Sequence, residues 1–208
     1  MQTRRQLLQQ YILLPFVPPL ITGQATTASA RNLEILAESD CLSQESARGF
    51  ALIPPRCAEV VVVCGAGLVA SSWAPELRRR AAAGAWILWE AAPHASDPSQ
   101  FRAFRETMQN VFGIKIGSPF EPGLYIEHVW PTRDLTRSFL AAMPVECSPS
   151  EIVARYGRIP VAMKRRIGGG GIVFLGSMLG PNLAAEEREA HRIAAGLMRV
   201  LGKDIQRG

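Results

Sequence analysis

The sequence predicts an α/β fold in which a mostly parallel sheet carries helices on both faces and has an antiparallel edge near the C-terminus. Apolar, β-branched stretches alternate with amphipathic stretches along the chain, which is typical of βαβ units. The stretches 59–64 and 85–90 are almost wholly apolar, as expected of strands covered on both faces. Two later apolar stretches flank the glycine turn 168–171, which predicts a hairpin.

Each predicted strand is a short apolar run bounded by turn residues. The first is weakly marked, whereas the second contains four consecutive valines, Val60 to Val63, and is followed by glycine. The fourth lies inside the loop-rich, proline-containing stretch 119–149. The predicted strands are 33–37, 59–64, 85–90, 124–129, 160–163 and 172–176.

Three helices are predicted, at 73–83, 99–112 and 183–201. Glycines follow the first two, at Gly84 and Gly113, as helix C-terminal caps. The second helix has a phenylalanine and methionine stripe at helical spacing, which is a buried face. The chain has 208 residues, which is enough for one domain of ordinary size plus a short extension, so we expect a single domain over residues 31–208.

The composition is that of a globular protein, with 48% hydrophobic and 20% charged residues among 208. The net charge of +5 raises the question of nucleic acid. However, the basic runs Arg78–Arg80 and Lys164–Arg166 lie far apart, each beside apolar residues. They predict solvated faces rather than one continuous basic stripe, so no nucleic-acid partner is expected.

Residues 1–30 have the three parts of a secretory signal: a basic start, a short apolar run and the small-residue pattern Ala28-Ser29-Ala30. The pair Arg4-Arg5 followed by Leu7-Leu8 resembles a twin-arginine signal. The apolar run contains three prolines and is too short to span a bilayer. We therefore expect an exported, periplasmic or extracytoplasmic protein without a transmembrane span in its mature chain.

Four cysteines, at positions Cys41, Cys57, Cys64 and Cys147, allow up to two disulfides in an oxidising compartment. Their spacing leaves the pairing open. No cysteine pair has the spacing of a zinc site, and no metal or other cofactor is expected.

The sequence VVVCGAGLVA, residues 61–70, is open to several interpretations. As a dinucleotide loop, Gly65 and Gly67 would let the backbone approach a pyrophosphate, and Glu90 would bind a ribose hydroxyl. The helical pattern begins several residues later than such a loop requires. No later part of the sequence resembles the catalytic part of a dinucleotide-dependent enzyme.

A second interpretation makes Cys64 a nucleophile at a strand-to-helix turn. His94 or His128 would be its base, oriented by Glu90 or Glu127. The alternative is that Cys64 is a small buried residue or half of a disulfide. Because three histidines in any chain offer such a pairing, the buried cysteine is favoured.

The strand 59–64 with its glycine loop, the helix-glycine-strand run 75–88 and the closing strands 158–176 resemble the class I glutamine amidotransferase-like superfamily, a flavodoxin-like group that includes ThuA-like proteins. The likeness covers residues 33–202. Active members have G-x-C-x-G at the nucleophile, but Val62 stands at the first glycine here. The late His-x-Glu pair has no counterpart, so the resemblance implies a degenerate, non-catalytic member.

Trp130 lies in the loop-rich stretch with Tyr125, His128 and Arg133, where a ligand or protein partner is most readily accommodated. The sequence thus predicts an exported binding or assembly protein that is not an enzyme. The alternatives are a cysteine hydrolase or amidase that uses Cys64, and a nucleotide-binding protein that uses the glycine loop.

Overall fold

The structure is a computed structural model that describes residues 33–53, 55, 59–91, 97–138 and 141–201. The targeting segment 1–30, Cys57 and His94 lie outside these residues. The described chain contains an eight-stranded sheet with the order β1-β2-β3-β10-β9-β8-β5-β6 and a two-stranded sheet formed by β4 and β7.

One half of the large sheet is parallel. Its strands are β1 (Leu33–Ala37), β2 (Val60–Cys64), β3 (Trp86–Glu90) and β10 (Gly170–Leu175). All residues of β2, β3 and β10 are buried. The strands predicted at 33–37, 59–64, 85–90 and 172–176 are confirmed within one or two residues, because an unbroken apolar run suits only a strand covered on both faces.

The other half is antiparallel and contains β9 (Ile159–Ile167), β8 (Ile152–Tyr156), β5 (Tyr125–His128) and β6 (Asp134–Arg137). Four of the seven strand pairs in the sheet are antiparallel, so the prediction of a mostly parallel, flavodoxin-like sheet is wrong. The antiparallel part is half of the sheet rather than one edge. The sequence missed β6 because it is short and mostly polar, and it missed β8 because its five residues form only a brief apolar run that ends in Arg155 and Tyr156.

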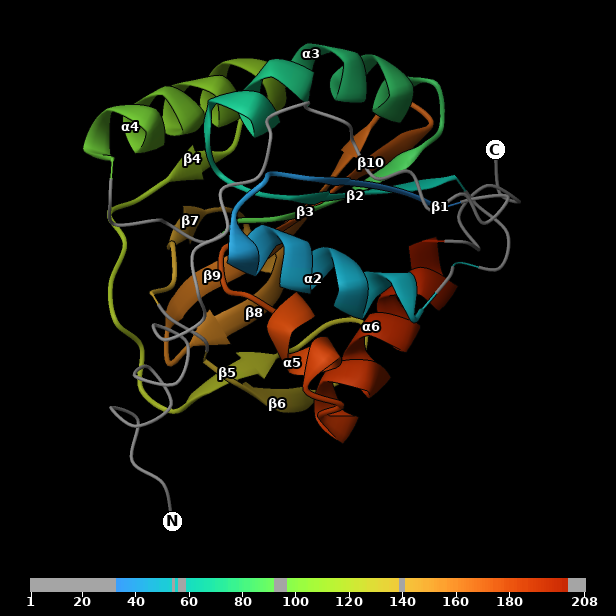
Figure 1. Cartoon of the computed structure of the whole chain (residues 1–208), viewed down its shortest axis with the longest axis vertical. Helices are drawn as coiled ribbons and strands as arrows, with labels where there is room; N and C mark the ends of the chain where they lie inside the picture. The colour runs from blue at the N-terminus through green and yellow to red at the C-terminus, as the bar shows by residue number, and fades with distance from the viewer. Residues whose placement is uncertain (1–32, 54, 56–58, 92–96, 139–140, 202–208) are drawn as a thin grey trace, which may run out of the picture.

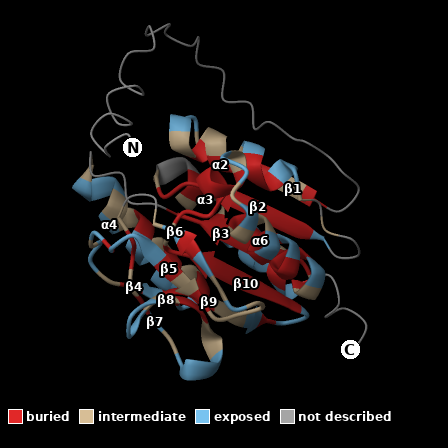
Figure 2. Ribbon diagram, turned by 90° about the horizontal axis from the view of Figure 1, so that it is seen from below, coloured by how far each residue is buried: buried red, intermediate tan, exposed pale blue. Residues whose placement is uncertain are grey.

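Helices cover both faces of the parallel half (Figure 1). On one face lie α3 (Leu68–Ala82), α4 (Pro98–Thr107) and the π-helical turn η1 (Met108–Phe112), which continues α4. On the other lie α2 (Cys41–Ala51), α5 (Gly180–Ala184) and α6 (Arg188–Leu201). Figure 2 shows the buried strands between these layers.

The first two crossovers have opposite hands. Both β1-α2-β2 and β2-α3-β3 advance in the same direction across the sheet, yet α2 and α3 lie on opposite faces. Nearly all such crossovers are right-handed, so one of the two departs from the rule. This is a second difference from a flavodoxin-like order, in which the first strand lies inside the sheet rather than at its edge.

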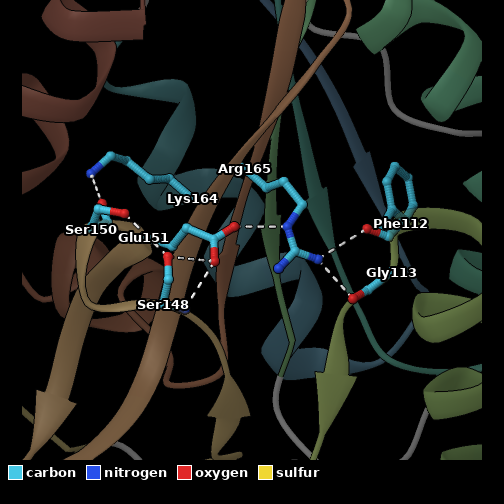
Figure 3. A network of polar contacts seen from close by, with 7 residues as sticks. All are labelled: Phe112, Gly113, Ser148, Ser150, Glu151, Lys164 and Arg165. Atoms are coloured by element: carbon cyan, nitrogen blue, oxygen red, sulfur yellow. Dashed lines mark hydrogen bonds and ion pairs between the residues drawn. The ribbon is translucent and has the colours of Figure 1, made fainter.

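A half-buried ion pair connects the antiparallel half of the sheet to the layer of helices that contains α4 and η1. Arg165 on β9 donates from Nε to Glu151 Oε1 at 2.8 Å and from Nη1 to the Gly113 carbonyl oxygen at 2.7 Å (Figure 3). Glu151 belongs to η2 (Pro149–Glu151), a turn of 3-10 helix whose capping box it forms with Ser148. The hydrogen bond from Arg165 lowers the pKa of Glu151 to about 2.

Both basic runs are engaged within the chain. Arg80 pairs with Glu34 and Glu59, Arg79 with Glu76, and Arg78 donates to the Val111 carbonyl oxygen. In the second run, Lys164 donates to the Ser150 carbonyl oxygen and lies 4.6 Å from the centre of the Trp130 ring. Because these contacts are made within the chain, neither run forms a continuous, unpaired basic surface of the kind that binds nucleic acid.

Candidate functional site

The carboxyl ends of the four parallel strands meet at one edge of the sheet, where open α/β folds bind their ligands. Glu38 follows β1, the loop Gly65–Gly67 follows β2, and Glu90 ends β3. The segment that leads into α5 follows β10. Three of the residues predicted for a site, Cys64, Gly65 and Glu90, therefore do lie side by side.

The glycine loop holds a carboxylate of the chain itself. Glu38 Oε2 accepts from the amides of Ala66 at 3.0 Å and Gly67 at 2.9 Å, and its Oε1 accepts from the amide of Ala70 at 3.1 Å. These amides belong to the first turn of α3 and the loop before it, where the helix dipole favours a negative charge. The carboxylate of Glu38 thus occupies the place where a dinucleotide-binding loop would hold a phosphate of its ligand.

The carboxylate of Glu38 lies close against the glycines of the loop, so a larger residue at either position would displace it. A Cβ added at Gly65 would lie 2.4 Å from Glu38 Oε2, and one added at Gly67 would lie 2.5 Å from Oε1. Gly65 also has a φ of +147°, which other residues rarely adopt. The glycine pattern that resembles a dinucleotide loop is therefore explained by an internal helix cap.

The thiol of Cys64 is buried, with 1% of the residue exposed. Burial, followed by the charges of Glu90 and Asp40, raises the pKa of Cys64 well above that of a free thiol. A nucleophilic cysteine needs the opposite surroundings, in which a cationic or hydrogen-bonding partner stabilises the thiolate. The structure gives Cys41, Cys64 and Cys147 as free thiols.

Glu90 is buried but fully hydrogen-bonded. Its Oε1 accepts from Ser46 Oγ at 2.6 Å, and its Oε2 accepts from the amides of Leu179 at 2.7 Å and Gly180 at 2.9 Å. Burial raises its pKa. Since all these partners come from α2 and the start of α5, Glu90 joins elements of the fold and is not directed at an open site.

The histidine predicted as a base lies far from the thiol. His128 is on β5, five strand positions from Cys64 on β2, which is about 24 Å across the sheet. It is 4% exposed, and its Nε2 lies 3.1 Å from Thr136 Oγ1. The other candidate base, His94, is outside the described residues. Glu127 directly precedes His128 on β5, and its side chain pairs with Arg155 and Arg133.

A second location, on the antiparallel half, is open to solvent. An open groove of about 860 Å³ runs along β5 and β6 to the start of α6, and it is lined by Tyr125, Glu127, Arg133, Asp134, Leu135, Arg137, Glu187 and Glu189. The prediction placed a ligand or partner surface in this stretch of sequence. Tyr125 and Arg133 line the groove, whereas Trp130 is partly buried beneath Lys164 and packs on the core.

Sequence reasoning missed Glu38 and Ser46. Glu38 was within reach, because an acidic residue directly after a predicted strand falls at the same sheet edge as the glycine loop. Ser46 was not, since its helix had no apolar pattern clear enough to predict.

The described residues contain no cluster of histidine, cysteine and acidic side chains able to hold a metal ion. Among the same residues, no helix is both long enough and apolar enough to cross a bilayer.

No protein-family model and no curated protein matches the chain. Solved structures do resemble it. The exo-β-1,4-mannosidase Op5Man5 from Opitutaceae bacterium strain TAV5 matches with a TM-score of 0.50 and 17% identity, over 70% of this chain and 26% of the mannosidase. The cytoplasmic protein STM1381 from Salmonella typhimurium LT2 matches with a TM-score of 0.53 and 12% identity, over 70% of this chain and 73% of its own.

These likenesses concern the fold alone. The chain corresponds to about a quarter of the mannosidase, so the activity of that enzyme is not transferred. The resemblance to the glutamine amidotransferase-like superfamily stays a prediction, apart from the mostly parallel sheet that it implied.

We predict that acid destabilises the fold through His128. Burial lowers the pKa of His128 to about 4, while its pKa in the unfolded chain is near 6.5. Between these values only the unfolded chain binds the extra proton, so stability is complete above pH 6.5 and falls as the pH drops toward 4. The loss is about 3 kcal/mol. Urea unfolding of His128→Gln should lack this dependence, and His191→Gln should retain it. An unchanged slope in His128→Gln would contradict the assignment.

We also predict that Cys64 resists alkylation in the folded protein. At pH 8 its labelling by iodoacetamide should be at least ~100-fold slower than that of exposed Cys41, because a buried neutral thiol reacts only after local opening. Mass spectrometry of tryptic peptides measures both rates in one sample, with urea as the control for full reactivity. Rapid labelling of Cys64 below pH 7 would restore it as a candidate nucleophile.

Proposed function

We propose that this protein is a non-catalytic binding or assembly protein that works outside the cytoplasm. One observation carries the proposal: the sheet edge at which α/β folds bind ligands is filled by the chain's own carboxylates. Glu38 accepts hydrogen bonds from the loop amides that an anionic ligand would need. Glu90 accepts hydrogen bonds from the first amides of the α5 region. Cys64 is a buried neutral thiol and lies far from His128, so the predicted nucleophile and this predicted base are not in contact.

The groove along β5 and β6 supports a binding role instead of a catalytic one. It is open, and it combines exposed Tyr125 and Leu135, each 50% exposed, with arginine side chains. Tyrosine and arginine are the residue types that most often dominate the free energy of protein association. We therefore place the binding surface at β5 and β6, with a protein as the partner.

A photo-crosslinking experiment tests the binding role. A benzophenone amino acid in place of Tyr125, in the full chain produced in cells, should give a discrete adduct on irradiation. The same group in place of Arg102, which is exposed on α4, is the matched control and should give none. The adduct should persist in Cys64→Ala. Absence of any adduct at Tyr125, or its loss in Cys64→Ala, would contradict the proposal.

Export rests on the N-terminal pattern and has its own test. Replacing both Arg4 and Arg5 with lysine preserves charge but removes the arginine pair that a twin-arginine signal needs. We expect the variant to stay in the cytoplasmic fraction, while wild type and Arg102→Lys reach the exported fraction. Export of the double-lysine variant at the wild-type level would exclude the twin-arginine route, and cytoplasmic wild type would exclude export.

A further inference from the structure

The hairpin formed by β5 and β6 is weakly attached to the rest of the large sheet. In the described chain β6 is an outer strand and pairs with β5. β5 in turn pairs with β8 at two positions, Glu127 and His128, whereas β9 and β10 pair at six. The amides of Val129 and Trp130 add hydrogen bonds to the Val153 carbonyl oxygen at 2.9 and 3.3 Å. Because few hydrogen bonds hold it, the hairpin belongs to the segments that open most readily.

Side-chain contacts hold the hairpin against α5 and α6, which lie beside it in Figure 1. Asp134 on β6 pairs with Arg192 on α6 at 2.7 Å. Arg137 pairs with Glu187, just before α6, at 3.5 Å. The Arg137 carbonyl oxygen also accepts from Asn182 Nδ2 of α5 at 2.9 Å. The hairpin therefore meets the helices through a few polar contacts as well as through its buried residues.

The open groove spans the junction between the hairpin and α6. Tyr125 and Leu135 contribute to it from the hairpin, whereas Glu187 and Glu189 contribute to it from the start of α6. The groove keeps its shape only while the hairpin lies against the helix. Release of the hairpin would separate the two sides of the groove and remove the proposed binding surface.

His128 lies where the hairpin joins the sheet, because it is one of the two β5 residues that pair with β8. Its side chain is buried, and its Nε2 lies 3.1 Å from Thr136 Oγ1 of β6. Its Nδ1 has no hydrogen-bond partner among the described residues. A neutral imidazole can leave Nδ1 as an acceptor without a proton, but an imidazolium would bury an N–H and a positive charge there. Burying such a charge without a partner is unfavourable.

The groups around His128 do not compensate this charge. Burial lowers the pKa of His128 to about 4, and the charge of Asp134, opposite it on β6, offsets only part of the effect. The carboxylate of Asp134 is already paired with Arg192 of α6, which also pairs with Glu189 at 3.4 Å. The facing residue on β8 is Ala154, and α5 contains no ionisable side chain.

We propose that the β5–β6 hairpin is a pH-sensitive switch, in which protonation of His128 releases the hairpin from β8 and α6 and separates the sides of the groove. This inference rests on the proposed binding role and adds its regulation: the protein loses affinity for its partner in acid. Above pH 6.5 the ring is neutral in both states, so the closed state has its full stability. Between pH 6.5 and 4 only the open state binds the proton, and its population rises as the pH falls.

Hydrogen exchange at the Val129 amide tests the switch in the full chain. This amide is bonded to Val153 of β8 and exchanges when the hairpin leaves. Its protection, taken relative to the intrinsic exchange rate at each pH, should fall about 30-fold from pH 7.5 to pH 5.0. This is the factor for one group with a pKa of about 4 when closed and about 6.5 when open. His128→Gln should show no such fall, and His191→Gln should behave as wild type.

Low urea separates release of the hairpin from unfolding of the whole protein. Exchange through local release is nearly independent of urea below about 1 M, whereas exchange through global unfolding accelerates with the slope of the unfolding transition. Circular dichroism verifies that each variant folds, and His128→Leu replaces His128→Gln if it does not. Unchanged protection of Val129 in acid, an equal loss in His128→Gln, or exchange with the global urea slope would each overturn the inference.

The benzophenone group at Tyr125 shows whether the switch controls binding. In a cell extract, the adduct that forms at pH 7.5 should decrease at pH 5.0 in proportion to the closed fraction that Val129 protection gives. In His128→Gln it should be retained. Equal adduct at both pH values, despite release at Val129, would overturn the control of binding. No adduct at either pH, with Val129 behaving as expected, would contradict the binding role and support the switch alone.

Discussion

The carboxylate of Glu90 is the contact on which the arrangement of the parallel half depends. It ends β3, and it binds the side chain of Ser46 on α2 and the first amides of the α5 region at once. Leaving a buried hydrogen-bonding group without its partner typically costs about 1–3 kcal/mol, because the remaining group has lost its solvation without compensation. Few other side chains in the described core carry a polar group, so this bond sets where α2 and α5 meet.

The close approach of α2 and α5 follows from that bond. A Cβ at Gly49 would lie 2.4 Å from the Gly180 carbonyl oxygen, so the two helices pack backbone against backbone. This contact covers the carboxyl ends of β2 and β3 on the face where Cys64 is buried. The sheet edge that serves as a binding crevice in many α/β folds is therefore closed by packing as well as by Glu38.

The two halves of the sheet then have different roles. The parallel half is covered on both faces, and both hydrophobic cores extend from it into the antiparallel strands. The outer strands β5 and β6 carry alternating buried and exposed residues, as strands with one solvated face do. β10 joins the halves, because it is parallel to β3 on one side and antiparallel to β9 on the other. A half that is covered by helices on both faces supports outer strands that have one solvated face, and this arrangement suits a binding protein.

The sequence by itself determined the four strands of the parallel half and the apolar character of their residues. The short, β-branched run Val60–Cys64 followed by glycine indicates a buried strand, and the glycines that follow the helices mark their ends. Only the tertiary structure decided that half of the sheet is antiparallel, since strands such as Asp134–Arg137 owe their conformation to pairing with neighbours rather than to apolar periodicity. It also decided the partners of the candidate residues. The loop after β2 binds Glu38 because β1 pairs with β2, and His128 lies far from Cys64 because four strands of the sheet separate theirs. No local pattern encodes this strand order.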